Sequence, residues 1–208
     1  MLLYYITDRT QFPGGELERW KRLLASIAEA ARCGIDYVQL REKELATRDL
    51  ETLARDAMER IRATGGKTRL LINSRTDVAL AAEADGVHLK SKDVLPEEVR
   101  KIWRNGKGSA QPLVAVSCHT EAEVLAAEKS GADFVVFGPV FAKKDASEMG
   151  TAGMDLLEAV CRIGIPVFAL GGVTAENAAM CMAAGAKGIA GIRLFQGKNV
   201  TETVAKLR

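Results

Sequence analysis

Several features that mark other classes of protein are missing from this sequence. No apolar run approaches the ~20 residues that a membrane-spanning helix needs, so we expect no membrane partner. The first eight residues, Met1 to Asp8, lack a basic segment and turn polar too soon for a secretion signal. Charge of one sign is also lacking, since 29 Lys and Arg stand against 27 Asp and Glu. That near-balance argues against nucleic acid as a partner, because a general polyanion binder carries a strong basic excess.

Cysteine is scarce, and its spacing points to neither metal nor disulfide chemistry. The four cysteines form no C-x-x-C pair, which argues against a disulfide framework and against a cysteine zinc site. We therefore expect reduced thiols and a cytoplasmic protein. The four are Cys33, Cys118, Cys161 and Cys181.

What the sequence does have is a regular alternation of short apolar runs and longer amphipathic ones, in a chain of 208 residues that is 48% hydrophobic. The short runs are apolar on both faces, as in a parallel sheet covered by helices. They predict strands at Leu2–Ile6, Tyr37–Leu40, Arg69–Ile72, Gly86–Leu89, Leu113–Ser117, Phe134–Phe137, Val167–Ala169 and Gly188–Ile192. The longer stretches predict helices that include Leu17–Cys33, Thr47–Ala63, Pro96–Arg104, Glu121–Lys129, Met154–Arg162 and Asn177–Ala183.

Eight strand-and-helix units in 208 residues leave about 26 residues for each, which suits a (β/α)8 TIM barrel near its lower size limit of about 200 residues. We therefore predict an α/β protein in which residues 1–208 form a single barrel domain. The main rival is a doubly wound open sheet. That fold usually carries G-x-G-x-x-G after its first strand, and this sequence has no such motif there.

A weak internal repeat supports the barrel. Similar segments start at Gly34, Glu83, Gly131 and Gly185, with separations of 49, 48 and 54 residues. Each segment would form the turn from a helix into an even-numbered strand. Glycine at three of the four starts suits a helix end in the left-handed region. A separation near two 26-residue units predicts a barrel made of four similar quarters.

Polar residues follow most of the predicted strands, at the rim where a barrel has its active site. Six cations would share that rim although the whole chain carries a net charge of only +2, which predicts a focused anion site. The alternative for any one of them is simple exposure to solvent. The six are Arg41, Lys43, Arg75, Lys143, Lys144 and Arg193.

The densest polar cluster is Gln39-x-Arg41-Glu42-Lys43. Gln39, Arg41 and Lys43 fall on one face of an extended strand end, because side chains alternate there with period two. Their donors could grip a diphosphate, with Arg offering a planar fork and Lys a point charge. The alternative is that Arg41 and Glu42 form only an ion pair at the rim.

Two further segments are candidates for substrate binding. Gly171-Gly172, followed by Thr174 as the expected helix N-cap, is typical of a phosphate cradle after the seventh strand of a barrel. Residues 138–153 follow the sixth strand and form the longest stretch without clear periodicity. A loop that covers the substrate belongs at that place in a barrel.

Three residues are candidates for metal or proton chemistry. Asp93 would recruit Mg²⁺ beside bound phosphates, or else cap the helix that opens near Pro96. His119 follows the fifth strand, where an acid/base role and a phosphate-binding role are both open. His88 lies inside an apolar strand, which favours a hydrogen-bonded core histidine over a ligand.

Taken in chain order, these motifs resemble the thiamin phosphate synthase/TenI superfamily of (β/α)8 barrels, over nearly the whole length. The resemblance implies one of two activities. The synthase couples hydroxymethylpyrimidine diphosphate to thiazole phosphate and releases pyrophosphate with Mg²⁺, whereas the TenI-type enzyme tautomerises a thiazole carboxylate phosphate. The motifs are Tyr5-Ile6-Thr7-Asp8-Arg9, Gln39-Leu40-Arg41-Glu42-Lys43, Ile72-Asn73, Asp85-Gly86-Val87-His88-Leu89, Ser117-Cys118-His119-Thr120, Gly138-Pro139-Val140-Phe141 and Gly171-Gly172-Val173-Thr174.

The resemblance also implies roles for individual residues. Arg41, Lys43 and His119 would be catalytic, and Asp93 would bind Mg²⁺. The small phosphorylated substrates would contact Gln39, Asn73, Ser117, Gly172, Ile192 and Arg193. To these the residues themselves add Gly171, from the glycine pair, and Lys143 and Lys144, from the cationic rim.

The sequence departs from the synthase pattern at two places. Ser74 stands where a second Mg²⁺ carboxylate is usual, and Ala142-Lys143-Lys144-Asp145-Ala146 replaces a Thr-x-Thr/Ser-Lys run. Gln39 and Lys43, which the pyrimidine diphosphate needs, are retained. We therefore expect a transferase of the synthase type, with the tautomerase as the alternative. A third possibility is a non-catalytic barrel that binds thiazole phosphate or thiamin phosphate, and assembly into a homo-oligomer stays open.

Overall fold

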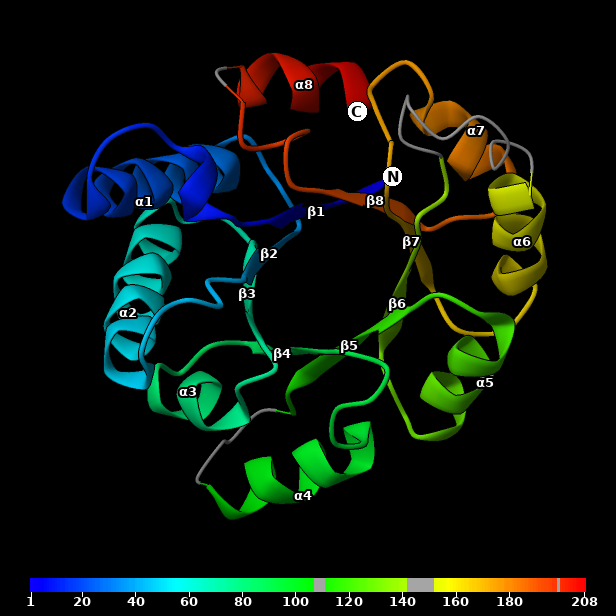
Figure 1. Cartoon of the computed structure of the whole chain (residues 1–208), viewed down its shortest axis with the longest axis horizontal. Helices are drawn as coiled ribbons and strands as arrows, with labels where there is room; N and C mark the ends of the chain where they lie inside the picture. Colours follow the sequence, from blue (N-terminus) through cyan, green and yellow to red (C-terminus); the bar gives the residue numbers. More distant parts are fainter. Residues whose placement is uncertain (107–110, 142–151, 198) are drawn as a thin grey trace.

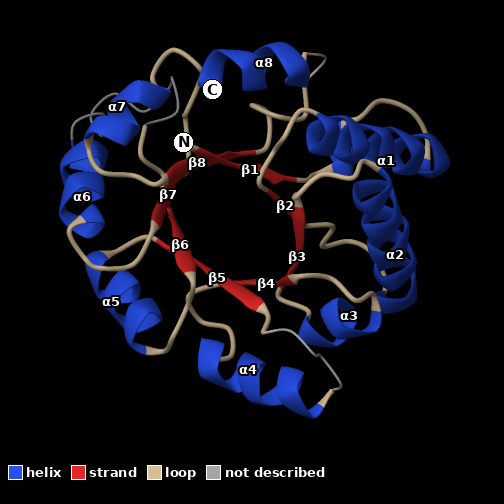
Figure 2. Ribbon diagram, turned by 180° about the vertical axis from the view of Figure 1, so that it is seen from behind, coloured by secondary structure: helices blue, strands red, loops and turns tan. Residues whose placement is uncertain are grey.

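Eight parallel strands form a closed barrel in the computed structural model, which describes residues 1–106, 111–141, 152–197 and 199–208. Each strand pairs with its neighbour in sequence, and β1 pairs with β8 to close the ring (Figure 2). The closure excludes the open-sheet rival. The strands are β1 (Leu2–Ile6), β2 (Tyr37–Leu40), β3 (Arg69–Asn73), β4 (Gly86–Leu89), β5 (Leu113–Cys118), β6 (Phe134–Phe137), β7 (Val167–Ala169) and β8 (Gly188–Gly191).

The helices surround the barrel and cover the outer face of every strand (Figure 1). A short 3₁₀ helix, η1 (Arg9–Gln11), follows β1. The predicted strands agree with the observed ones to within one residue at each end, and the predicted helices to within two. The helices are α1 (Glu16–Arg32), α2 (Thr47–Ala63), α3 (Thr76–Ala81), α4 (Pro96–Asn105), α5 (Glu121–Lys129), α6 (Ala152–Cys161), α7 (Ala178–Ala183) and α8 (Val200–Leu207).

The internal repeat has the predicted place in the fold, directly before the even-numbered strands. Gly34, Gly131 and Gly185 have φ angles of +84°, +82° and +98°, in the left-handed region that glycine favours. Glu83 starts the remaining copy and adopts φ +52° despite its side chain. The four helix-to-strand turns therefore share one backbone geometry.

The third position of the repeat holds neighbouring strands together at the end of the barrel opposite the predicted active site. Asp36, Asp85 and Asp133 each place Oδ2 2.7–2.8 Å from a backbone N–H near the start of the preceding odd-numbered strand. These carboxylates satisfy amide groups that are partly buried. The fourth copy has Lys187 at this position, whose backbone carbonyl accepts from the N–H of Leu2.

The interior of the barrel is packed with side chains, as in other barrels of eight strands. Tyr4, Tyr37, Phe134 and Phe168 form a cluster with ring centroids 4.8–6.0 Å apart. Tyr4 is fully buried and points its hydroxyl toward the rim residues His88 and Gln39. The aromatic cluster therefore fills the barrel interior directly below the polar residues at its C-terminal end.

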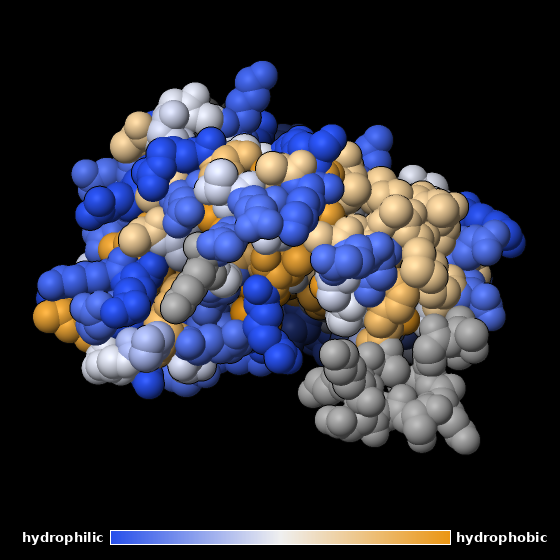
Figure 3. Space-filling view, turned by 90° about the horizontal axis from the view of Figure 1, so that it is seen from above, coloured by the Kyte–Doolittle hydropathy of each residue, from blue (hydrophilic) through white to orange (hydrophobic). Residues whose placement is uncertain are grey.

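None of the described helices is both long and apolar enough to cross a membrane. Figure 3 shows one face of the molecule, on which hydrophilic residues are widely spread between smaller apolar areas.

Candidate active site

A cavity of about 430 Å³ opens at the C-terminal ends of the strands, the end that the sequence predicts for the active site. Seven of the predicted site residues line it together, and they come from the ends of β2, β3, β5 and β8. The seven are Gln39, Arg41, Lys43, Asn73, Ser117, His119 and Ile192. The remaining lining residues are Ile6, His88, Lys90, Ser91, Lys92 and Leu170.

The electrostatic character of this cavity is cationic. Arg41, Lys43, Lys90 and Lys92 line it, and none of its described lining residues is Asp or Glu. Because the whole chain carries only +2, this is a local concentration of positive charge that attracts anions. Lys90 and Lys92 had no assigned role in the sequence analysis, although they directly follow β4 and so carry the same signal as the residues that did.

A chain of hydrogen bonds runs beneath the cavity through a buried histidine. Tyr4 Oη lies 2.8 Å from His88 Nδ1 and 3.4 Å from Gln39 Nε2, and His88 Nε2 lies 2.7 Å from Ser117 Oγ. His88 is therefore the hydrogen-bonded core histidine that the sequence favoured. Burial, together with the charge of Arg41, lowers the pKa of His88 to about 3, so its ring is neutral at physiological pH.

The direction of these hydrogen bonds follows from their donors. Gln39 Nε2 can only donate, so the Tyr4 hydroxyl accepts from it and uses its own proton toward His88 Nδ1. The neutral His88 ring then carries its proton on Nε2 and donates to Ser117 Oγ. The hydroxyl proton of Ser117 is left to donate to a ligand in the cavity.

His119 presents one ring nitrogen to the cavity. Its Nδ1 lies 2.5 Å from the carbonyl oxygen of Gly138, which can only accept, so Nδ1 carries a proton. Its backbone N–H donates to Glu123 Oε2 at 2.6 Å. Burial works to raise the pKa of Glu123, but this bond and one from Ser91 lower it overall, which keeps the carboxylate charged. With Nδ1 bonded to Gly138, Nε2 is the ring nitrogen left for contact with a substrate.

Asp93 lies beside the cavity and does not cap α4, so that alternative is wrong. Leu95 is the N-cap of α4, whereas Asp93 Oδ2 accepts from Ser74 Oγ at 2.5 Å and from the Lys90 N–H at 2.9 Å. Among the described residues, no group of three or more His, Cys, Asp and Glu side chains could hold a metal ion. One carboxylate with a neighbouring hydroxyl still fits Mg²⁺, which takes one or two carboxylates and completes its shell with phosphates and water.

The structure differs from the sequence-based expectations for Glu42 and Arg75. Glu42 makes no ion pair with Arg41, because it is buried against Arg9, with Oε2 3.1 Å from Arg9 Nη1. Arg41 is therefore not neutralised by its neighbour in sequence. Arg75 does not line the cavity and pairs instead with Asp77, at 2.6 Å between Nη2 and Oδ2.

The two glycines after β7 are required by close packing. Gly171 and Gly172 have φ angles of +95° and +66°, and a Cβ on either would lie 2.7 Å from an atom of Pro139 or Phe141. A turn separates Thr174 from α7, and Asn177 holds the N-cap position without a side-chain capping bond. Thr174 still makes contacts typical of a capping residue, because its Oγ1 accepts from the Asn177 N–H at 3.4 Å and its carbonyl accepts from the Ala178 N–H at 3.0 Å. Arg193 is exposed, and Lys143 and Lys144 lie outside the described residues.

A parallel (β/α)8 barrel with a cationic cavity at the C-terminal ends of its strands defines a class of proteins that bind small phosphorylated molecules. Comparison with known families narrows this class. Residues 3–195 match the thiamine monophosphate synthase family. The chain belongs to that family.

Individual relatives agree with this assignment. The chain is 44% identical over 190 residues to a relative from Geobacter sulfurreducens, covering 90% of this chain and 83% of that one. It is 40% identical over 191 residues to the thiamine-phosphate synthase of Clostridium novyi, covering 90% and 86%. A thiamine phosphate pyrophosphorylase structure from Pyrococcus furiosus superposes with a TM-score of 0.80 at 30% identity, covering 100% of this chain and 93% of that one.

Proposed function

We propose that this protein is a thiamin phosphate synthase, which couples hydroxymethylpyrimidine diphosphate to thiazole phosphate and releases pyrophosphate. The observation that carries the proposal is the cavity itself, in which Gln39, Arg41, Lys43 and Asn73 meet at a cationic rim. Membership of the thiamine monophosphate synthase family supports the same activity.

The reaction exchanges one bond for another. The C–O bond between the pyrimidine methylene and the diphosphate breaks, and the thiazole nitrogen forms a new C–N bond to that methylene. The bonding electron pair leaves with the diphosphate. Donors placed where this negative charge develops therefore lower the barrier most. Arg41 and Lys43 would have this catalytic role, and the neighbouring Lys90 and Lys92 would add to the field.

The other residues would orient the two substrates. Gln39, Asn73 and the outward-donating Ser117 hydroxyl would bind the pyrimidine diphosphate. Gly171, Gly172, Ile192 and Arg193 would cradle the thiazole phosphate through backbone N–H groups. The carbonyl oxygens of Gly171 and Gly172 already accept from Phe141 N and Asn177 Nδ2. Lys143 and Lys144 complete the proposed substrate-binding set.

Mg²⁺ is part of this proposal. Asp93 would hold the ion, with the Ser74 hydroxyl beside it and Asn73 Nδ2 donating to that hydroxyl. When bound, Mg²⁺ would neutralise charge on the diphosphate and make it a better leaving group.

A coupled assay tests the proposal. The purified protein is incubated with both substrates and Mg²⁺, and released pyrophosphate and thiamin phosphate are quantified against reactions that omit one substrate. Pyrophosphate release that depends on both substrates supports the synthase. Turnover of neither substrate, at protein concentrations that give clear substrate binding, would contradict it and leave a binding protein for thiazole phosphate or thiamin phosphate.

A second candidate is the tautomerase, which moves a proton on a thiazole carboxylate phosphate. The observation in its favour is His119, whose fixed Nδ1 proton leaves Nε2 as an acid/base group on the cavity. Conversion of the tautomer without pyrophosphate release would support this activity over the synthase.

A further inference from the structure

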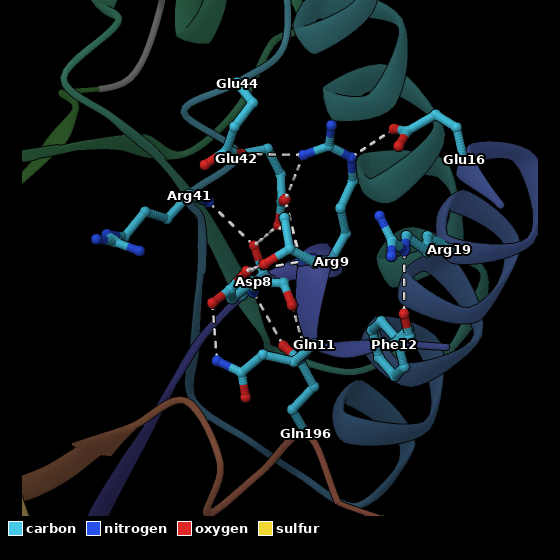
Figure 4. Close-up of polar contacts among 12 residues, drawn as sticks. Asp8, Arg9, Gln11, Phe12, Glu16, Arg19, Arg41, Glu42, Glu44 and Gln196 are labelled. Carbon is cyan, nitrogen blue, oxygen red and sulfur yellow. Dashed lines mark hydrogen bonds and ion pairs between the residues drawn. The ribbon is translucent and has the colours of Figure 1, made fainter. Parts of the chain in front are cut away.

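A buried ion pair lies directly behind the cavity wall, between the ends of β1 and β2. Arg9 and Glu42 are 5% and 3% exposed, although charged residues are almost never buried unless paired. Figure 4 shows that Arg41 and Glu42 point in opposite directions, with Glu42 toward Arg9 and Arg41 away from it. Glu42 therefore sits between two residues, Arg41 and Lys43, that line the cavity.

The Glu42 carboxylate is hydrogen-bonded through both oxygens. Oε1 accepts from Thr7 Oγ1 at 2.6 Å, and Oε2 accepts from Arg9 Nη1 at 3.1 Å. The backbone N–H of Arg9 lies within 3.2 Å of both oxygens. One side chain thus fastens the segment after β2 to the segment after β1.

Thr7 connects this carboxylate to the backbone of Arg41. The Thr7 hydroxyl donates to Glu42 and accepts from the Arg41 N–H at 3.0 Å. The backbone nitrogen of Arg41 is therefore bonded to the same hydroxyl that donates to Glu42. Thr7 is fully buried, so no water can substitute for it.

Stabilisation of the fold alone does not explain the buried pair of Arg9 and Glu42. Burial raises the pKa of Glu42, while hydrogen bonds from Thr7 and Arg9 oppose the rise. A buried ion pair is often no more stabilising than well-packed apolar side chains of similar volume. Fixed donors and acceptors, in contrast, specify one backbone path, and this path sets the direction of the two cavity cations.

We propose that Thr7, Arg9 and Glu42 are positioning residues that fix the backbone at Arg41 and Lys43, so that both cations converge on the diphosphate. This inference rests on the proposed function, because it concerns the same cavity. It adds residues that touch no substrate and act only through their hydrogen bonds to the 41–43 segment.

The chain offers a matched pair of carboxylates for the test. Glu42 and Glu44 lie 3.1 and 3.2 Å from the same atom, Arg9 Nη1, but only Glu42 is joined to Thr7. Glu44 is 60% exposed, so the loss of its ion pair should have little effect. Thr7 offers a second contrast, since Thr7→Val keeps the shape and removes the hydroxyl, whereas Thr7→Ser retains the hydroxyl.

The experiment measures binding of inorganic pyrophosphate by calorimetry and KM for each substrate. We expect Glu42→Gln and Thr7→Val to weaken pyrophosphate binding and to raise KM for the pyrimidine diphosphate, each by about tenfold or more, because small misplacements of binding groups are costly. In both variants, KM for thiazole phosphate should stay within about twofold of the wild-type value. For Glu44→Gln and Thr7→Ser, pyrophosphate binding and KM for each substrate should also stay within about twofold of wild type.

The outcomes separate this inference from the proposed function. Wild-type protein that binds no pyrophosphate would overturn the proposed function. Tight binding by wild type, Glu42→Gln and Thr7→Val alike would overturn the positioning role only. Equal rises in KM for both substrates, or loss of the cooperative thermal transition in both variants, would assign these residues to folding and reject the positioning role.

Discussion

Ser74 donates a hydrogen bond from its hydroxyl to Asp93 Oδ2, with 2.5 Å between the two oxygens. The contact joins the end of β3 to the loop after β4, beside the cationic cavity. A second carboxylate is usual at position 74 in synthases that this sequence resembles. Ser74 has φ +57°, a left-handed conformation that Asp adopts more readily than most residues. The backbone at this position therefore already suits a second carboxylate.

We predict that Asp93→Asn lowers the rate of pyrophosphate release by about two orders of magnitude, because the carboxylate proposed to hold Mg²⁺ is lost. We also predict that Ser74→Asp lowers the Mg²⁺ concentration for half-maximal rate by about tenfold, since two carboxylates hold the ion better than one. Both effects are measured by titrating Mg²⁺ in the pyrophosphate assay.

Glu98→Gln serves as the control for the Mg²⁺ titration, because Glu98 lies on α4 and, within the part of the chain that the structure describes, pairs only with exposed Lys101. It should leave the Mg²⁺ dependence unchanged. If Asp93→Asn kept the wild-type rate and Mg²⁺ dependence, Asp93 would have no part in metal binding.

His119 separates the two candidate activities. His119→Asn can still donate to the Gly138 carbonyl, as Nδ1 does, but has no group at the position of Nε2. In a synthase, this variant should lose less activity than Asp93→Asn. In a tautomerase the order reverses, with near-complete loss at His119 and little effect at Asp93, because proton transfer then depends on the ring. Both variants are measured in both assays, and unchanged activity in all four measurements would exclude both mechanisms.

The strands were predictable to within one residue because they are short, largely apolar runs, most of which are followed by polar residues. Seven residues of the cavity followed from the same pattern, since the C-terminal ends of parallel strands meet at one end of a barrel. Lys90 and Lys92 carried this signal too, because they directly follow β4, although the predicted site did not include them.

The contacts of Glu42 and Thr174 were not predictable in the same way. A strand end shows which face a side chain takes, but not which residue from another segment meets it. Glu42 pairs with Arg9, 33 residues away, rather than with its neighbour Arg41. Thr174 is a residue type that favours the N-cap, yet a turn separates it from α7, whose N-cap position is held by Asn177.

The repeated aspartates give a prediction about stability. Asp85 Oδ2 accepts from the N–H of fully buried Leu70 at 2.8 Å, so Asp85→Ala leaves that amide without its partner. We expect a loss of about 1–3 kcal/mol in the free energy of unfolding. Lys187→Ala changes the equivalent position of the fourth copy, where the side chain is exposed, and should cost less than about 0.5 kcal/mol. Urea unfolding of both variants measures the difference, and equal losses would refute a special role for the aspartate.

Buried His88 predicts how stability depends on pH. Its pKa in the folded protein is about 3, chiefly through burial, with Arg41 lowering it further and Asp93 opposing, against an ordinary value of 6.5. As pH falls below 6.5, the unfolded chain takes up a proton at His88 and the folded protein does not. The contribution of His88 is therefore fully present above pH 6.5 and is lost progressively toward pH 3.

At pH 5 this linkage lowers the free energy of unfolding by about 2 kcal/mol. The figure follows because pH 5 lies about 1.5 units below the pKa of His88 in the unfolded chain, and each unit is worth about 1.36 kcal/mol. His88→Gln cannot titrate, so its free energy of unfolding should fall less than that of wild type between pH 7 and pH 5. Urea unfolding at several pH values gives the difference in free energy of unfolding between wild type and His88→Gln. The titration of carboxylates, which the two proteins share, largely cancels in this difference. Parallel curves for wild type and His88→Gln over this range would show that His88 has the same pKa in the folded and unfolded protein, and would contradict the lowered pKa of the buried ring.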